Sequence, residues 1–169
     1  VKEYINQIAF SGATDFLNKY KDKTNEDQII GHFGLGFYSA FMVAKDVRVI
    51  TKKAGSDEAY EWVSAGEDGY EITPCTKETN GTTIILTLKE DTDEEKYSQY
   101  LETYELKELI KKYSDYIRYP IKMNVETQKM KEGTEESEKP EYETVVEDQT
   151  LNSMVPLWKR QKSKITDEE

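Results

Sequence analysis

The clearest pattern in the chain is an alternation of apolar and polar residues between positions 46 and 89. Four runs carry β-branched or aromatic residues at every second position: Val47/Val49, Tyr60/Trp62, Tyr70/Ile72 and Thr82/Ile84/Leu86/Leu88. Turn-forming residues separate these runs, namely Gly55-Ser56-Asp57, Gly66-Glu67-Asp68-Gly69 and Asn80-Gly81. A period of two indicates strands with one buried face, and the short links predict an antiparallel meander.

Residues 104–118 instead have the period of a helix. Apolar side chains fall on one face and charged ones mostly on the other: Leu106, Leu109, Ile110, Tyr113 and Ile117 against Lys107, Glu108, Lys111 and Lys112. Pro120 ends this helix, and Ile121–Val125 is typical of one more strand. The helix over residues 104–118, together with a helix over Phe37–Ala44, can cover the apolar face of the sheet. We therefore predict an α+β fold, a two-layer α/β sandwich with a mixed, mainly antiparallel sheet.

The first 36 residues predict a helical flap. Apolar residues recur at helical spacing over 1–20 but are interrupted at Ser11-Gly12, so we expect two short helices joined at a hinge, with Thr14 or Asp15 capping the second. A polar link, residues 21–30, follows. A lid over a ligand and a plain surface hairpin both fit, and the pattern alone favours the hairpin.

The composition changes at residue 127. Residues 127–150 contain three lysines and eight acidic residues, a net charge of 3 − 8 = −5, and no apolar period before Val145-Val146. Such a segment favours a flexible acidic tether. We therefore expect a folded domain over 1–126, a linker over 127–150 and a separate segment over 151–169, which by itself is typical of a disordered tail.

Charge and residue counts narrow the function. The chain has 169 residues, a net charge of −11, one cysteine and one histidine. The negative charge argues against nucleic acid or an anionic membrane as the main partner. Cys75 alone cannot form an internal disulfide, and with His32 it cannot supply a Cys/His metal site. Without an apolar run of membrane-spanning length or a secretory segment, a reducing cytosol is the expected location.

One motif points to ligand chemistry. Glycines at 31, 34 and 36 precede the apolar stretch Phe37–Ala44, as in loops that hold a phosphate at the start of a helix. The amides of Gly34, Leu35, Gly36 and Phe37 would bind the anion, and Gly31 would act as a hinge. The Phe37 ring would lie against a nucleotide or pack in the core. The spacing alone is weak, since an ordinary helix start after a loop has the same pattern.

The wider sequence strengthens this hypothesis. IGHFGLGFYSAFMVA resembles the third nucleotide-binding box of the heat shock protein 90 chaperones, in their bacterial HtpG type. The resemblance continues in register through IAFSGATDFL (8–17), VRVITKK (47–53), NGTTIILTLKED (80–91) and VPLWKR (155–160), and so covers essentially the whole chain. It implies the GHKL/Bergerat-type ATPase fold, with a lid over about 11–36, a charged linker over 127–150 and the start of a middle domain from 151.

The resemblance also implies roles for single residues. Ser11 would offer a hydroxyl in the lid, although helix capping explains it equally well, and Thr82 would reach the adenine through ordered water. The family's adenine-binding aspartate box, general-base glutamate and magnesium-binding asparagine do not occur in this sequence, and Phe10 stands where many relatives carry a lid lysine. We therefore expect an N-terminally truncated domain, without catalytic activity of its own, from a slow ATPase.

By the same resemblance, the intact protein would be an ATP-dependent molecular chaperone. It would bind ATP or ADP with Mg²⁺, form a homodimer and remodel unfolded or partly folded client proteins in the cytoplasm. The alternative from another class is a non-catalytic protein-interaction module that binds no nucleotide. A sensor-kinase ATPase domain is disfavoured by the Phe-Tyr-Ser-Ala sequence at residues 37–40.

Overall fold

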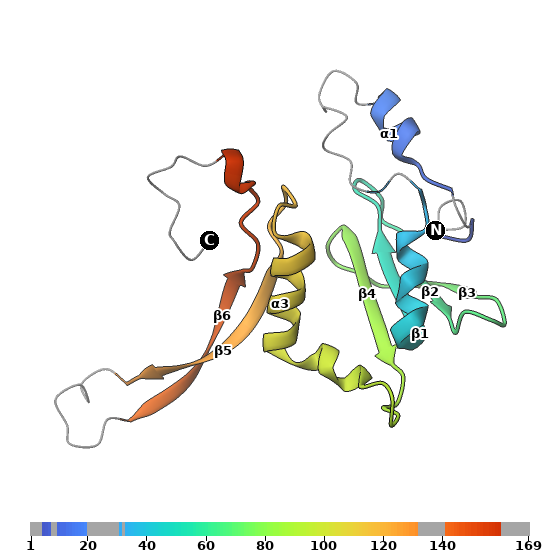
Figure 1. The fold of residues 1–169 in the computed structure, drawn as a ribbon. Coiled ribbons are helices and arrows are strands. Elements are labelled where there is room, and N and C mark those ends of the chain that lie inside the picture. The colour runs from blue at the N-terminus through green and yellow to red at the C-terminus, as the bar shows by residue number, and fades with distance from the viewer. Residues whose placement is uncertain (1–4, 8–9, 20–30, 32, 132–140, 160–169) are drawn as a thin grey trace. The chain divides into compact units, whose positions relative to one another are not determined.

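The chain folds as an α+β protein with antiparallel sheets and few helices, as the sequence predicts (Figure 1). The computed structural model describes residues 5–7, 10–19, 31, 33–131 and 141–159. It divides into two compact units, Val1–Ser98 and Gln99–Glu169, and we describe each by itself. The division therefore falls at Ser98, ahead of the boundary expected near residue 126.

The first unit is built on a four-stranded sheet. Its strands are β1 (Ala44–Lys52), β2 (Ala59–Ser64), β3 (Glu71–Cys75) and β4 (Gly81–Leu88), which confirms the four predicted runs. The order is β3-β2-β1-β4, so the first three strands form a meander and β4 returns to pair with β1. The prediction of a simple meander is wrong at this step. The central place goes to β1, whose Val47 and Val49 are fully buried.

A short helical segment covers one face of this sheet. It begins as a 3-10 turn, η2 (Gly36–Ser39), and continues as α2 (Ala40–Val43), close to the helix predicted at Phe37–Ala44. Phe37 and Phe41 from this segment meet Trp62 of β2 at ring-centroid distances of 5.6 and 6.5 Å. Trp62 and the β1 residues Ala44, Val47 and Val49 form the core. Period-two alternation thus brings the buried positions to the face that the helix covers.

The flap is seen only in part. Helix α1 (Ala13–Lys19) matches the second of the two predicted helices. Of the first, residues 5–7 form turns and bends and Phe10 is not helical; the remaining positions lie outside the described residues, as do 20–30. The lid hypothesis for residues 11–36 therefore stays a prediction.

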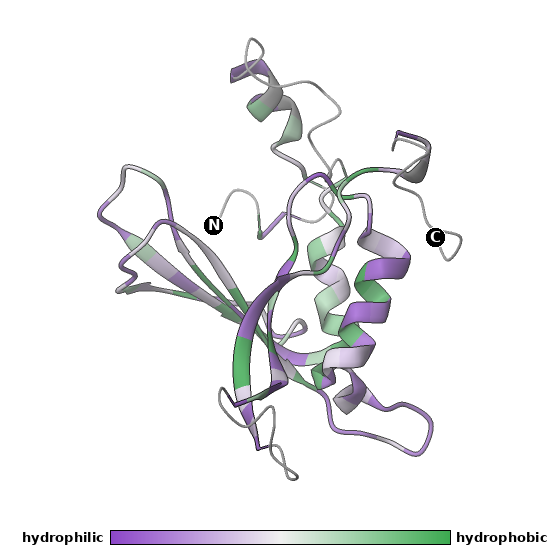
Figure 2. Cartoon of the chain, turned by 90° about the vertical axis from the view of Figure 1, so that its left-hand side faces the viewer, coloured by the Kyte–Doolittle hydropathy of each residue, from purple (hydrophilic) through white to green (hydrophobic). Residues whose placement is uncertain are grey.

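The second unit consists of one helix and one long hairpin. A 3-10 turn, η3 (Tyr97–Leu101), spans the boundary between the units, and α3 (Thr103–Ser114) follows it. Strands β5 (Lys122–Met130) and β6 (Tyr142–Thr150) pair from Lys122↔Thr150 to Met130↔Tyr142. Helix α3 carries both hydrophilic and hydrophobic residues around its axis, as its period predicts (Figure 2). Whether it also covers the four-stranded sheet stays a prediction.

The hairpin corrects the prediction of a flexible tether. Residues 127–130 and 142–150 are strand, while 132–140 lie outside the described residues. Three of the acidic side chains here are paired with lysines of the same hairpin: Lys122 with Asp148, Lys129 with Glu147 and Lys131 with Glu141. The segment after β6 is also held in this unit: the Leu151 amide donates to the Ile121 carbonyl at 2.8 Å, so residues 151–155 are not a free tail.

Candidate phosphate-binding loop

Gly34 holds the glycine loop in a shape that only glycine adopts easily. Its φ is +67°, and a Cβ at this position would lie 2.1 Å from the carbonyl oxygen of Phe10. The backbone of the loop thus passes directly against the backbone at Phe10, the position where the sequence lacks a lid lysine. Gly34 therefore has a structural role, because a side chain there would force the two segments apart.

Gly36, unlike Gly34, has open space where a side chain would lie. It opens η2 directly after the exposed Leu35, and a Cβ built on it would have no atom within 4 Å. The first bond of the helical segment runs from the Tyr38 amide to the Leu35 carbonyl at 3.1 Å. The amides before Tyr38 thus precede the segment's own hydrogen bonds, which is the arrangement that attracts an anion.

Ser11 and Gly31 meet at the base of the flap. The Ser11 hydroxyl donates to the Gly31 carbonyl at 3.2 Å and accepts from the Ala13 amide at 3.2 Å. The second bond ties Ser11 to the first residue of α1, while the Gly12 carbonyl accepts the first helical bond, from the Phe16 amide at 2.9 Å. Gly12 therefore holds the cap position, and the prediction that Thr14 or Asp15 caps this helix is wrong, because both lie inside it. The bond from Ser11 to Gly31 joins two residues twenty positions apart, the first residue of the predicted lid and the predicted hinge. Gly31 itself is exposed, with room for a Cβ.

Phe37 packs among aromatic side chains, and Thr82 lies on β4 beside Thr51 of β1. The Phe37 ring packs edge-on against Tyr38, Phe41 and Trp62, which favours the core interpretation over contact with a nucleotide. Thr82 is an exposed residue of β4, and its hydroxyl lies 2.9 Å from that of Thr51 on β1. In the described part of the chain, no hydrogen bond joins Thr82 to the glycine loop.

A cavity of about 590 Å³ adjoins the helical segment, and the sequence pattern does not reveal it. Apolar and aromatic groups of Phe41, Trp62 and Tyr70 line it together with Lys45 and Lys89. Asn6 also lines it: its Oδ1 accepts from the Trp62 indole at 2.8 Å, and its buried Nδ2 has no partner among the described groups. Its volume falls in the range of small-molecule sites.

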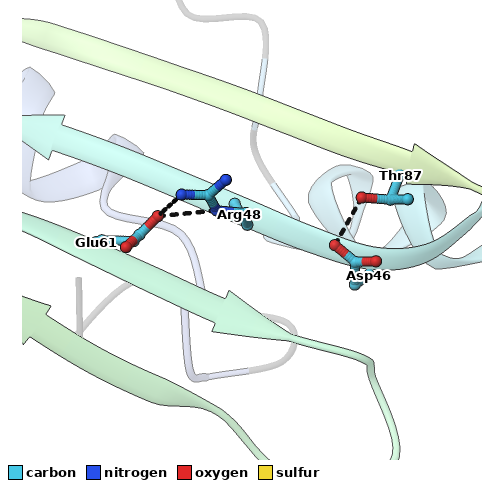
Figure 3. A network of polar contacts seen from close by, with 4 residues as sticks. All are labelled: Asp46, Arg48, Glu61 and Thr87. Carbon is cyan, nitrogen blue, oxygen red and sulfur yellow. Dashed lines mark hydrogen bonds and ion pairs between the residues drawn. The ribbon is translucent and has the colours of Figure 1, made fainter.

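The polar network on β1 offers no catalytic group to the loop. Asp46 accepts from the Thr87 hydroxyl at 2.7 Å, and Arg48 donates to Glu61 from Nε at 2.8 Å (Figure 3). Asp46 and Arg48 alternate with the buried Val47 and Val49, so they lie on the opposite face of the sheet. In the described ranges there is also no group of three or more His, Cys, Asp or Glu residues that could hold a metal ion.

None of the helices in the described part of the chain combines the length and apolar composition needed to cross a membrane.

Comparison with known proteins connects this geometry to a family. The family model for Hsp90 protein matches residues 99–144. The chain is 55% identical over 169 residues to "Chaperone protein HtpG" of Alkaliphilus metalliredigens, covering 100% of this chain and 26% of that protein. It is 53% identical over 169 residues to the protein of that name from Bacillus subtilis, again with 100% and 26% coverage. The chain thus spans about a quarter of the length of the curated relatives it matches.

Proposed function

Because this chain belongs to the Hsp90 family, with 55% and 53% identity over its 169 residues to two bacterial HtpG proteins, we propose that it forms part of an ATP-dependent molecular chaperone. The observation that carries the proposal is the 55% identity across all 169 residues to a protein named as a chaperone. Unfolded or partly folded client proteins would be its partners, it would act as a homodimer, and it would work in the cytoplasm.

We further propose that the loop from Gly31 to Phe37 binds the phosphates of ATP or ADP. Exposed backbone at Leu35 and Gly36, ahead of the first helical hydrogen bond, supports this assignment. The open space at Gly36 would let a phosphate oxygen approach the backbone. Lys45 and Lys89 line the neighbouring cavity and would add positive charge. The bond between Ser11 and Gly31 supports a lid that closes on this loop.

The described residues do not fit a role in hydrolysis. Magnesium would neutralise phosphate charge and a base would orient water in the reaction. The described ranges contain no cluster of metal ligands, and the family's glutamate, asparagine and aspartate-box motifs do not occur in the sequence. The proposed task of this chain is therefore binding, through backbone amides, with no chemical step assigned to it.

Calorimetric titration of this chain with adenosine, AMP and ADP tests the phosphate assignment. Because contacts go to phosphate and the sequence lacks an adenine anchor, affinity should rise with each phosphate and stay weak. Dissociation constants of about 50 μM to 1 mM for ADP would correspond to about −6 to −4 kcal/mol. Equal affinity for adenosine and ADP, or low-micromolar binding of both, would contradict the assignment.

Gly36→Val is the matching variant, with Ala54→Val as its control. Valine at residue 36 meets no protein atom within 4 Å of its Cβ but occupies the space proposed for the anion. Residue 54 is an exposed turn position far along the chain from the loop. We expect Gly36→Val to lose ADP binding with an unchanged melting profile, while Ala54→Val retains both.

The interaction-module alternative has one observation in its favour. Among the strands that the structure describes, β4 is an edge strand that pairs with β1 alone, and it exposes 52% of Ile84 and 39% of Leu86. An unpaired apolar strand is a template for another chain. If ADP produces no binding heat and a variant with Ile84→Lys changes self-association or protein binding, this alternative is supported over nucleotide binding.

A further inference from the structure

The chain leaving β6 is fastened to the end of α3 by polar groups. Asn152 is the centre of this contact and is only 5% exposed. Its Oδ1 accepts from the Ile121 amide at 2.8 Å, and its Nδ2 donates to the carbonyls of Ile117 and Tyr119 at 2.7 and 2.9 Å. One buried side chain thus satisfies three backbone groups of the loop between α3 and β5.

Asp115, the residue after α3, makes the second half of the contact. Its carboxylate accepts from the Ser153 amide at 2.9 Å and from the Ser153 hydroxyl at 2.7 Å. Its carbonyl accepts from the Met154 amide at 2.9 Å. Carboxylate-to-amide bonds of this kind are stronger than bonds between neutral groups.

The backbone is strained just beyond these bonds. Met154 has a φ of +61° and is the only residue other than glycine with a positive φ in the described part of the chain. A side chain with a Cβ disfavours this region, so the conformation persists only where neighbouring contacts impose it. Here the imposing contacts are those of Asp115. If they break, the strain at Met154 is released, which favours opening.

The aromatic contact that opposes such an opening is largely exposed to solvent. Trp158 touches the Tyr116 ring edge-on at 5.7 Å but is 77% exposed, and Val155 is 43% exposed. The hairpin has its own ladder from Lys122↔Thr150 onward, which does not require residues 152–159. The contact can therefore open while α3 and the hairpin keep their hydrogen bonds.

We propose that Asp115, Asn152 and Ser153 form a latch with a closed and an open state. When closed, it joins residues 152–159 rigidly to the end of α3. When open, it frees that segment while α3, β5 and β6 remain folded. The latch decides whether the chain beyond β6 moves with α3 or independently of it, and this holds whether or not the glycine loop binds a nucleotide.

Hydrogen exchange of individual amides in this chain tests the latch. In the unchanged protein, the amides of Ile121, Ser153 and Met154 should exchange at least about ten-fold faster than those midway along β5 and β6. Asn152→Asp keeps the shape but turns a carboxylate oxygen toward two carbonyls, and Ser153→Asp sets a carboxylate against Asp115. Each should speed exchange of the three latch amides a further ten-fold or more, with ladder and α3 amides within about two-fold.

Thr150→Asp is the control, since it adds the same charge on the exposed face of β6 three residues earlier. It should leave the latch amides unchanged. Loss of the nuclear Overhauser contact between the rings of Tyr116 and Trp158 in the two latch variants would report the released segment independently. Unaltered latch exchange in both variants, or ladder and latch amides rising together, would overturn the proposal. So would uniform exchange across the unit in the unchanged protein.

Discussion

Each of the two units is stabilised internally by a different kind of contact. The first is organised around apolar groups, with Ala44, Val47, Val49 and Trp62 buried beneath an aromatic cover. In the second, the buried residues among those described are the apolar Val125 and the polar Asn152. Ion pairs join its two strands, and the hydrogen bonds of Asp115 and Asn152 join the segment after β6 to the end of α3 and the loop that follows it. An apolar deletion should therefore damage the first unit most, and a change of charge the second.

The largest effect we predict is for Trp62→Ala. Trp62 is 3% exposed, packs against Phe37 and Phe41 and donates to Asn6, so its removal leaves a large cavity and an unpaired amide. The cost should be about 3–5 kcal/mol, measured by denaturant unfolding followed through the exchange of β1 amides. Tyr60→Ala on the same strand is the control, since Tyr60 is exposed. A loss below about 1 kcal/mol for Trp62→Ala would contradict an apolar core centred on it.

A smaller loss is expected for Gly34→Ala. Alanine must adopt a φ of +67°, and its Cβ would meet the Phe10 carbonyl at 2.1 Å, so the flap base must shift. We expect about 1–3 kcal/mol of destabilisation in a thermal melt. Gly36→Ala is the matched control, because its Cβ meets nothing and its φ is not positive. Equal stability of the two variants would show that Gly34 does not hold the loop against Phe10.

The smallest predicted effect is a dependence of the hairpin on pH. The hydrogen bond from Lys129, with smaller help from Gln149 and the lysine charge, lowers the pKa of Glu147 below its ordinary 4.5. The contribution of the Glu147 carboxylate to the stability of the hairpin is present above about pH 4.5 and is lost as the pH falls through the lowered folded-state pKa. The bond to Glu147 raises the pKa of Lys129 above its ordinary 10.5, so that contribution is lost as the pH rises through the raised value.

Exchange of β5 and β6 amides checks this prediction. Protection should weaken below about pH 4.5 and above about pH 10.5, and 1 M salt should weaken it at neutral pH, since both groups face solvent. Glu147→Gln should reduce both the acid and the alkaline dependence, since it removes this pair and leaves the pairs of Lys122 with Asp148 and Lys131 with Glu141 in place. A pH profile that this variant does not alter would mean that the pair contributes nothing measurable.

These contrasts also explain what the sequence could and could not predict. The alternation at Val47, Val49 and Trp62 specifies which face is buried, so the strands of the first unit follow from a local pattern. The return of β4 to β1 does not, because the pairing joins residues that lie 29 to 44 positions apart, from Lys52↔Gly81 to Ala44↔Leu88. The hairpin was missed for a related reason: the acidity of residues 127–150 suggests a tether until Lys122 and Lys129 are seen across from the carboxylates.

The same distinction applies to the candidate site: the sequence predicts its local loop geometry and does not predict its contacts between distant segments. The glycine spacing predicted a loop with positive φ at the start of a helix, and Gly34 and η2 confirm that geometry. The meeting of Ser11 with Gly31 and the cavity at Asn6 and Trp62 depend on contacts between distant segments. No local pattern encodes them. The role of Phe37 was left open by the sequence for the same reason, since only the packed neighbours decide it.

The most direct test of the proposed function is an amide chemical-shift map of this chain titrated with ADP, AMP and adenosine. The account predicts that ADP shifts are largest at Gly34, Leu35, Gly36 and Phe37, smaller with AMP and absent with adenosine, and that Gly36→Val abolishes them. Shifts of equal size for all three ligands, or ADP shifts that avoid residues 34–37, would contradict phosphate recognition by the glycine loop.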